Sequence, residues 1–219
     1  AEKFAGDKQG HRLYLCARNR QVLEYTAREL QVRFPRALIK TYTADFAKPA
    51  EVNAFAHWVL KETGSIDILV NNAGIFEPGS VHNEPEQVLE RLMQVNMFSA
   101  YHLTRQLLPA MMKAGKGHIF NICSIASIKA YDNGGAYSIS KFALLGFSRN
   151  LREEMKPHGI KVTAVMPGAT YTDSWSSSGI DPSRFMEAQD IAEMIYVSSQ
   201  LSAGACVEDI IMRPQLGDI

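Results

Sequence analysis

The sequence predicts an α/β protein in which helices cover both faces of a parallel sheet. Short apolar runs alternate with helical segments along all 219 residues, which is the pattern of successive strand–helix units. Residues 66–70 form an apolar run that only Asp67 interrupts, and we expect it to be a strand buried on both faces. A hydrophobic content of 46% with 21% charged residues is typical of a globular protein. Because no repeat or linker interrupts the pattern, we expect a single domain over residues 1–219.

The elements follow one another in the order strand, helix, strand, helix. The expected strands are 13–17, 38–44, 66–70, 118–123, 161–166 and 207–212. The expected helices are 20–34, 50–63, 85–112, 136–156 and a last one near 190–201. Pro35, Gly64 and Pro157 follow three of these helices, because proline cannot continue a helix and glycine tolerates the backbone of a helix end. Residues 1–5 look like the end of a further helix.

The charge and the cysteine content argue against several classes of partner. The formal charge is zero, from 23 basic and 23 acidic residues, so neither nucleic acid nor a charged membrane surface is indicated. No stretch approaches the roughly 18 apolar residues that a membrane span needs. The three cysteines are scattered and the six histidines lack ligand spacing, so we expect no metal site. Cysteines of this kind fit a reducing compartment, and we expect a cytoplasmic protein.

One pair of residues suggests acid/base chemistry. Tyr137 and Lys141 stand four residues apart in a helical stretch, with Ser124 thirteen residues before the tyrosine. Residues at i and i+4 lie on the same helix face, so the Lys141 ammonium is expected to lower the pKa of the Tyr137 phenol, ordinarily about 10. On composition alone, a half-exposed tyrosine beside a solvated lysine is the more common meaning of this spacing. The motifs that accompany the pair favour the acid/base interpretation instead.

Four further motifs accompany the pair in a fixed order. They are Asn-Asn-Ala-Gly at 71–74, an asparagine at 96, Asn-Ile-Cys-Ser at 121–124 and Pro-Gly-Ala-Thr-Tyr-Thr at 167–172. In order and spacing, the chain resembles the short-chain dehydrogenase/reductase family over nearly its whole length. The resemblance implies a Rossmann-type doubly wound sheet in three layers, α/β/α, and an NADP-dependent oxidoreductase that reversibly reduces a carbonyl to an alcohol. It also implies a small-molecule substrate.

The resemblance implies four catalytic residues. Tyr137 would give a proton to the developing alkoxide, and Ser124 would donate a hydrogen bond to the same oxygen. Lys141 would also hold the nicotinamide ribose. Asn96 would hold a water that links Lys141 to solvent, although a plain buried asparagine bonded to backbone remains the alternative.

Further residues are expected around the cofactor. Ala17 stands where an NAD-binding carboxylate would be, and Arg18 follows with a guanidinium suited to the 2′-phosphate of NADP(H); a surface arginine is the alternative. Asp45, followed by Phe46, resembles the adenine contact, although an aspartate there can also be a turn residue. The remaining expected contacts are Asn72, Ala73 and Gly74 near the nicotinamide ribose, and Pro167, Gly168, Thr170 and Thr172 near the carboxamide.

One expected feature is missing from the sequence. No strand with a glycine-rich turn precedes Leu13, although proteins of this fold bind the cofactor pyrophosphate there. Either about 25 residues are lost before residue 1, or the protein cannot bind a dinucleotide tightly. We favour the first explanation, because removing a central strand would expose the hydrogen-bonding groups of its neighbours.

The substrate and the assembly are less well defined. Residues 173–189 are polar and serine-rich, as expected of a lid over the substrate, and Phe76 and Trp175 could form a pocket for a flat molecule. The carboxy-terminal residues and the stretch 167–175 resemble bacterial sepiapterin reductases, while a 3-oxoacyl carrier-protein reductase or a non-catalytic NADP(H)-binding regulator are alternatives. Helices 85–112 and 136–156 carry more apolar residues than one buried stripe needs, so we expect a homodimer or homotetramer.

Overall fold

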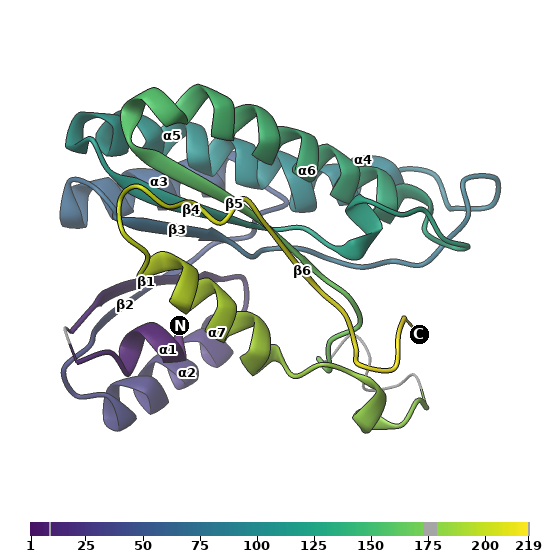
Figure 1. The fold of residues 1–219 in the computed structure, drawn as a ribbon, viewed down its shortest axis with the longest axis horizontal. Helices are drawn as coiled ribbons and strands as arrows, with labels where there is room; N and C mark the ends of the chain where they lie inside the picture. The colour runs from purple at the N-terminus through teal and green to yellow at the C-terminus, as the bar shows by residue number, and fades with distance from the viewer. Residues whose placement is uncertain (9, 173–178, 219) are drawn as a thin grey trace.

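The protein has three layers in the computed structural model, which describes residues 1–8, 10–172 and 179–218 (Figure 1). The strands lie in the middle layer, between two layers of helices. One helical layer consists of α3 (Pro49–Thr63), α4 (Val88–Met93), α5 (Ser99–Ala114) and α6 (Gly135–Met155). The other consists of α1 (Glu2–Ala5), α2 (Arg20–Arg33) and α7 (Ala188–Ser199). This is the expected doubly wound α/β fold.

The strands form two hydrogen-bonded groups in which every pair is parallel. The first group pairs β1 (Arg12–Ala17) with β2 (Leu38–Thr43). The second has the order β3 (Ile68–Asn71), β4 (Gly117–Ile122), β5 (Ile160–Pro167) and β6 (Asp209–Met212). Among the described residues, no strand pairs with the facing edges of β1 and β3. In the doubly wound order a further strand lies between these two edges.

The hydrophobic core joins the two groups of strands. On the face covered by α3 and α5, a cluster of buried side chains includes Leu69, Ile119 and Val162, and Tyr14 and Tyr42 pack against it. On the opposite face, Phe120 and Val165 pack with Ile195 of α7. Ile119 and Phe120 are neighbours on β4 and point to opposite faces, as the continuous apolar run of a doubly covered strand requires.

Most element boundaries differ from the predicted ones by one to three residues. The predicted strand 66–70 is Ile68–Asn71, and the predicted helix 136–156 is Gly135–Met155. The predicted helix 85–112 begins at Val88, and its π-helical turn η1 (Gln94–Phe98) separates α4 from α5. Asn96 lies in this turn, and π turns are often found at functional sites.

Neither a membrane-spanning helix nor a cluster of metal ligands is found among the described residues. No helix in them is long and apolar enough to cross a membrane. No group of three or more histidine, cysteine, aspartate or glutamate side chains in them is placed to hold a metal ion.

Candidate active site

Ser124, Tyr137 and Lys141 meet beyond the carboxyl end of β4. Ser124 follows this strand with an extended backbone and begins the short turn η2 (Ile125–Ser127), where its hydroxyl accepts a hydrogen bond from the Ala126 amide at 3.1 Å. The same hydroxyl is hydrogen-bonded to the Tyr137 phenol. Lys141 lies one turn after Tyr137 on α6, with its Nζ 5.9 Å from the centroid of the phenol ring.

Lys141 is buried and held by backbone. Only 6% of the residue is exposed, and its Nζ donates a hydrogen bond to the Ile122 carbonyl oxygen at 2.8 Å. Burial disfavours the charged ammonium and lowers the pKa of Lys141 to about 8. The lysine therefore loses its charge in a pH range that an enzyme can experience.

The Tyr137 phenol has a raised pKa. Burial raises the pKa of Tyr137 to about 12, and the hydrogen bond with Ser124 acts in the opposite direction without outweighing it. The expected lowering of this pKa by Lys141 is therefore wrong for this structure. The physical reason is that the ammonium is bonded to Ile122 rather than to the phenol oxygen, so burial dominates. Tyr137 is consequently protonated at neutral pH and can act as a proton donor.

Asn96 uses its side chain to connect two segments near Lys141. Its amide nitrogen donates to the Ile75 carbonyl oxygen at 3.0 Å and to the Ser140 hydroxyl at 2.9 Å, and its Oδ1 accepts from the Ile75 amide at 2.8 Å. These bonds match the alternative interpretation of Asn96, in which it is a buried asparagine that is hydrogen-bonded largely to backbone. They leave one lone pair on Oδ1, and the role in a proton relay stays a prediction.

The loop after β3 passes close to Lys141. Asn72, Ala73 and Gly74 are all exposed, and a Cβ added at Gly74 would lie 3.5 Å from the Lys141 Nζ and 3.4 Å from the Asn96 Oδ1. Glycine at this position therefore keeps open the surface above the lysine. The three residues are placed where a ligand could contact both the loop and Lys141.

The second expected cofactor segment lies at the end of β5. Pro167 is the last residue of this strand, and the Gly168 amide donates to the Met212 carbonyl oxygen at 2.8 Å. Thr170 is 9% exposed, and its hydroxyl donates to the Gly168 carbonyl oxygen at 3.0 Å. Thr172 is exposed. The Thr170 hydroxyl is thus engaged within the loop, which leaves Thr172 with the more accessible hydroxyl.

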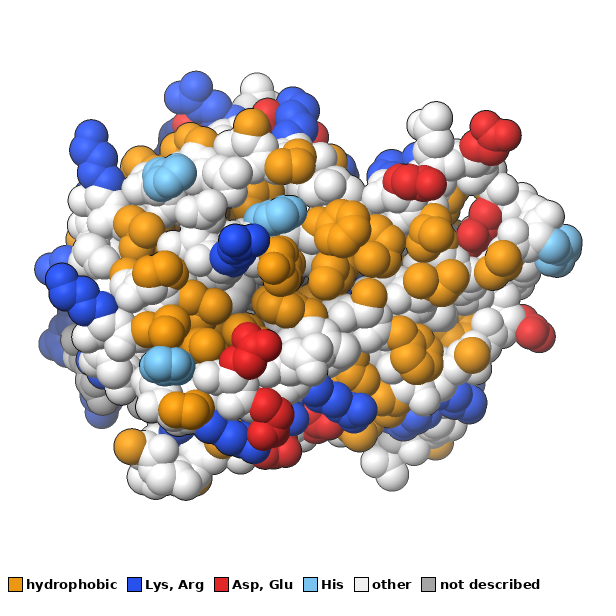
Figure 2. Space-filling model, turned by 90° about the horizontal axis from the view of Figure 1, so that it is seen from above, with side chains coloured by type: hydrophobic (Ala, Val, Ile, Leu, Met, Phe, Trp, Pro, Cys, Tyr) orange, Lys and Arg blue, Asp and Glu red, His pale blue; other side chains and the backbone are white. Residues whose placement is uncertain are grey.

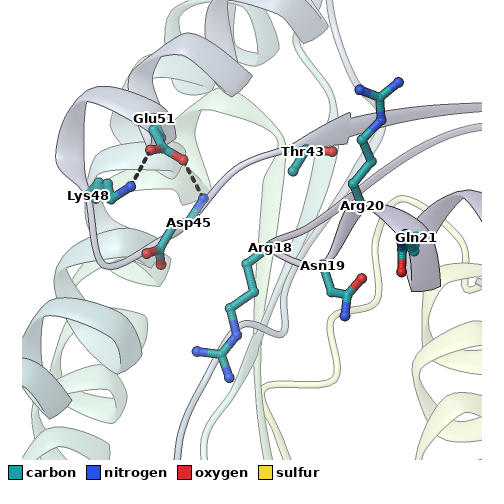
Figure 3. A pocket seen from close by; sticks show the side chains of 8 residues that line it. All are labelled: Arg18, Asn19, Arg20, Gln21, Thr43, Asp45, Lys48 and Glu51. Atoms are coloured by element: carbon teal, nitrogen blue, oxygen red, sulfur yellow. Dashed lines mark hydrogen bonds and ion pairs between the residues drawn. The ribbon is translucent and has the colours of Figure 1, made fainter.

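Arg18 and Asp45 line one pocket at the carboxyl ends of β1 and β2 (Figure 3). The pocket has a volume of about 630 Å³, and its other lining residues are Asn19, Arg20, Gln21, Thr43, Lys48 and Glu51. The Asp45 Oδ1 accepts from the Ala47 amide at 3.0 Å, as in the turn alternative. Phe46 packs against the hydrophobic core instead of lining the pocket. The sequence argument missed the other lining residues, although the basic residues Arg20 and Lys48 flank Arg18 and Asp45 and could have indicated them.

Aromatic side chains surround the Tyr137 phenol. The Phe76 ring contacts the Tyr137 ring edge to face, with centroids 4.8 Å apart. Tyr131, which the sequence argument missed, lies close enough to raise the pKa of Tyr137 and is 45% exposed. Its position six residues before Tyr137 was the only available signal. Trp175 lies outside the described residues.

The expected lid is described only in part. Residues 173–178 lie outside the described ranges, and Pro182–Arg184 form the short 3₁₀ turn η4. Phe185 and Met186 are 9% and 8% exposed, and Met186 pairs with Thr170 through a parallel bridge. This part of the segment is therefore packed against the loop after β5.

Comparison with known proteins gives several matches. The family described as short chain dehydrogenase matches residues 3–182. The sepiapterin reductase of Chlorobaculum tepidum is 33% identical over 191 residues, which cover 87% of this chain and 78% of that protein. Dehydrogenase/reductase SDR family member 7B of Bos taurus is 37% identical over 168 residues, 75% of this chain, and the match spans only 52% of that relative. A metagenomic short-chain oxidoreductase solved in complex with NADP is 29% identical, with a TM-score of 0.82 over 98% of this chain and 90% of the other.

Proposed function

Because the chain belongs to the short-chain dehydrogenase family, we propose that it is an NADP(H)-dependent oxidoreductase that interconverts a carbonyl compound and an alcohol. The observation that carries the proposal is the contact of the Ser124 hydroxyl with a Tyr137 phenol that is protonated at neutral pH. Such a pair can act on one carbonyl oxygen: one group transfers a proton and the other stabilises developing charge.

The cofactor supplies the hydride when it is bound, and the chain offers residues that fit it. The Arg18 guanidinium lines the pocket beyond β1 without a partner among the described residues, and it is suited to the 2′-phosphate of NADP(H). Gly74 leaves room beside Lys141, where the ammonium could hold a ribose hydroxyl. A solved structural relative contains NADP, which supports the same assignment.

The chain's own residues would divide the work as follows. Tyr137 gives its phenolic proton to the substrate oxygen as negative charge develops there. Ser124 donates a hydrogen bond to that oxygen. Lys141, held by the Ile122 carbonyl, would place its ammonium beside the nicotinamide ribose of the cofactor. Burial raises the pKa of Tyr137 to about 12, so the phenol holds its proton at neutral pH, which is the protonation state that carbonyl reduction requires.

The substrate class is a separate part of the proposal. The relation to a sepiapterin reductase and the aromatic contact between Phe76 and Tyr137 support a flat, ring-containing carbonyl compound such as a pterin. A 3-oxoacyl thioester is the second candidate. A non-catalytic NADP(H) sensor is less well supported, because Ser124, Tyr137 and Lys141 are all present and grouped.

We also propose a cytoplasmic homodimer or homotetramer. Apolar side chains gather on the face formed by the upper helical layer (Figure 2). On α5, α6 and the adjoining π turn, the exposed apolar residues include Phe98, Tyr101, Met112, Ile139 and Phe142, each 36–45% exposed. A second copy would cover these side chains in a symmetric contact. The three free cysteines are compatible with a reducing compartment.

The decisive experiment measures NADPH oxidation by absorbance with the full-length protein. The panel should contain simple ketones, diketones, pterins and 3-oxoacyl thioesters. Turnover of any of them supports the reductase, and the best substrate by kcat/KM identifies the class. Tight NADPH binding without turnover of any compound would favour the sensor, and absence of NADPH binding would refute both.

A further inference from the structure

Helix α6, which carries Tyr137 and Lys141, begins without a cap of its own. Its N-cap residue is Gly134, no side chain of the preceding residues caps it, and its first turn contains no acidic residue. The first amides of a helix lack intrahelical partners, and helix ends fray. Tyr137 is only the third residue of α6, so its position depends directly on this first turn.

A glutamate from a distant loop provides the missing acceptor. The Glu84 Oε1 accepts a hydrogen bond from the Ala136 amide at 2.8 Å, across 52 residues of sequence. Ala136 immediately precedes Tyr137. A carboxylate at this place satisfies a free amide and complements the positive end of the helix dipole. Glu84 therefore performs from outside the helix the role that an N-cap residue normally performs from within it.

The loop that carries Glu84 is attached to the residues before α6. The Gly79 amide donates to the Asn133 carbonyl oxygen at 3.1 Å, and the Ser80 hydroxyl donates to the Asn133 Oδ1 at 3.1 Å. The Glu84 amide in turn donates to the Ser80 carbonyl oxygen at 3.0 Å. These bonds hold the loop against the turn that leads into the helix.

Two glycines leave room for the Glu84 side chain. A Cβ added at Gly79 would lie 2.6 Å from the Glu84 Cγ, and one added at Gly135 would overlap the Glu84 Oε1. Gly135 also has a φ of +26°, which side chains rarely allow. Any larger residue at either position would displace the carboxylate from the Ala136 amide.

We propose that Glu84 is a positioning residue, which fixes the first turn of α6 and so holds the Tyr137 phenol against the Ser124 hydroxyl. The inference rests on the proposed reductase function for its catalytic consequence. The cap itself can be tested without any substrate. Glu84 is not among the groups that shift the pKa of Tyr137, so its effect should be one of geometry rather than of charge.

The test compares four variants of the full-length protein. Glu84→Ala removes the acceptor, Glu84→Gln keeps an acceptor oxygen without the charge, and Gly79→Ala displaces the carboxylate while retaining it. Glu86→Ala is the matched control, because Glu86 is an exposed glutamate of the same loop. Hydrogen–deuterium exchange of residues 134–141 measures fraying of the first turn, and steady-state kinetics give kcat and the KM for NADPH.

We expect Glu84→Ala and Gly79→Ala to accelerate exchange of these amides about five-fold, which corresponds to about 1 kcal/mol at 1.4 kcal/mol per tenfold. In the same two variants kcat should fall by at least about two-fold, because a displaced proton donor is catalytically costly. The KM for NADPH and the pH dependence of kcat should not change, and Glu84→Gln and Glu86→Ala should behave as the unmodified protein.

Each of the other possible outcomes would refute one part of the proposal. Unchanged exchange in Glu84→Ala would refute the cap. Faster exchange with unchanged kcat would refute the positioning role. Equal loss of kcat in Glu84→Ala and Glu84→Gln would show that the charge matters rather than the hydrogen bond. If the unmodified protein turns over no substrate, the proposed function fails, and the exchange data still decide whether Glu84 caps the helix.

Discussion

Replacing Arg18 by alanine should weaken NADPH binding by about ten- to a hundredfold and leave NADH binding nearly unchanged. Three basic side chains line the pocket beyond β1 and β2. The Arg20 Nε donates to Glu24 at 2.6 Å and the Lys48 Nζ donates to Glu51 at 2.9 Å. Arg18 makes no such bond to any described residue. Its guanidinium can therefore bind a phosphate without first giving up a partner.

The magnitude follows from one charge-assisted interaction. A hydrogen bond to a charged group contributes about 1.5–3 kcal/mol, and 1.4 kcal/mol is tenfold in affinity. NADH lacks the 2′-phosphate, so it should not sense the loss. Ala17, the last residue of β1, offers no carboxylate to the ribose hydroxyl that NADH carries instead. We therefore also expect the unmodified protein to prefer NADPH.

The assay is a calorimetric titration of the full-length protein with NADPH and, separately, with NADH, which gives the dissociation constant of each cofactor. Arg20→Ala is the matched control, since Arg20 lines the same pocket but is paired with Glu24. It should change neither affinity by much. Equal loss of NADPH and NADH binding in Arg18→Ala would refute the assignment of Arg18 to the phosphate, and so would a preference of the unmodified protein for NADH.

Four other predictions concern catalysis, stability and assembly. Tyr137→Phe should lower kcat about 10²–10⁴-fold with little change in NADPH affinity, and an unchanged kcat would exclude Tyr137 as the proton donor. The rate of reduction should fall as pH rises through about 8, where Lys141 loses its charge, and a rate that stays constant to pH 10 would contradict this role. Burial lowers the pKa of His118 from its usual value of about 6.5 to about 4. Below about pH 6.5 the unfolded chain therefore binds more protons than the folded chain, and this group should lower the free energy of unfolding by about 2 kcal/mol between pH 8 and pH 5. Denaturant titration should find no such loss in His118→Phe. Phe142→Glu on the exposed face of α6 should give monomers in sedimentation, and a monomeric unmodified protein at micromolar concentration would argue against the oligomer.

The fold and the pairing of Tyr137 with Lys141 were predictable because they depend on local patterns. The periodicity of residues 136–156 places Tyr137 and Lys141 on one helix face whatever else the chain does. The apolar run at 66–70 similarly predicted a strand, and the structure places β3 at Ile68–Asn71. The family resemblance then supplied Ser124, which the structure brings to the phenol. These features needed no knowledge of contacts between distant residues.

Features that depend on distant contacts were not predictable. The lowered pKa of Lys141 arises from burial, and its ammonium is bonded to the Ile122 carbonyl oxygen; neither feature follows from the i, i+4 spacing. The bond between Glu84 and Ala136 joins a loop to the first turn of α6, 52 residues later in the chain. The sequence does not distinguish a ligand contact from a turn residue at Asp45, and the hydrogen bond from the Ala47 amide to its carboxylate is seen only in the structure. In each case the residue type could be read from the sequence, but its hydrogen-bond partner could not.

The π turn at Gln94–Phe98 explains how one long helix keeps its apolar stripe on the side of the core. The buried residues Val88, Leu92, Asn96 and Ala100 are spaced in steps of four, and an α-helix advances about 100° per residue. Each such step would carry the stripe about 40° around the axis, and three steps would turn it away from the core. The additional residue held in the wider turn compensates for almost all of this drift. Deleting any one residue from the turn would rotate α4 by about 100° relative to α5, and Val88 and Leu92 would leave their cluster with Ala136 and Tyr137. The number of residues in this turn is therefore set by the packing of the helices on either side of it.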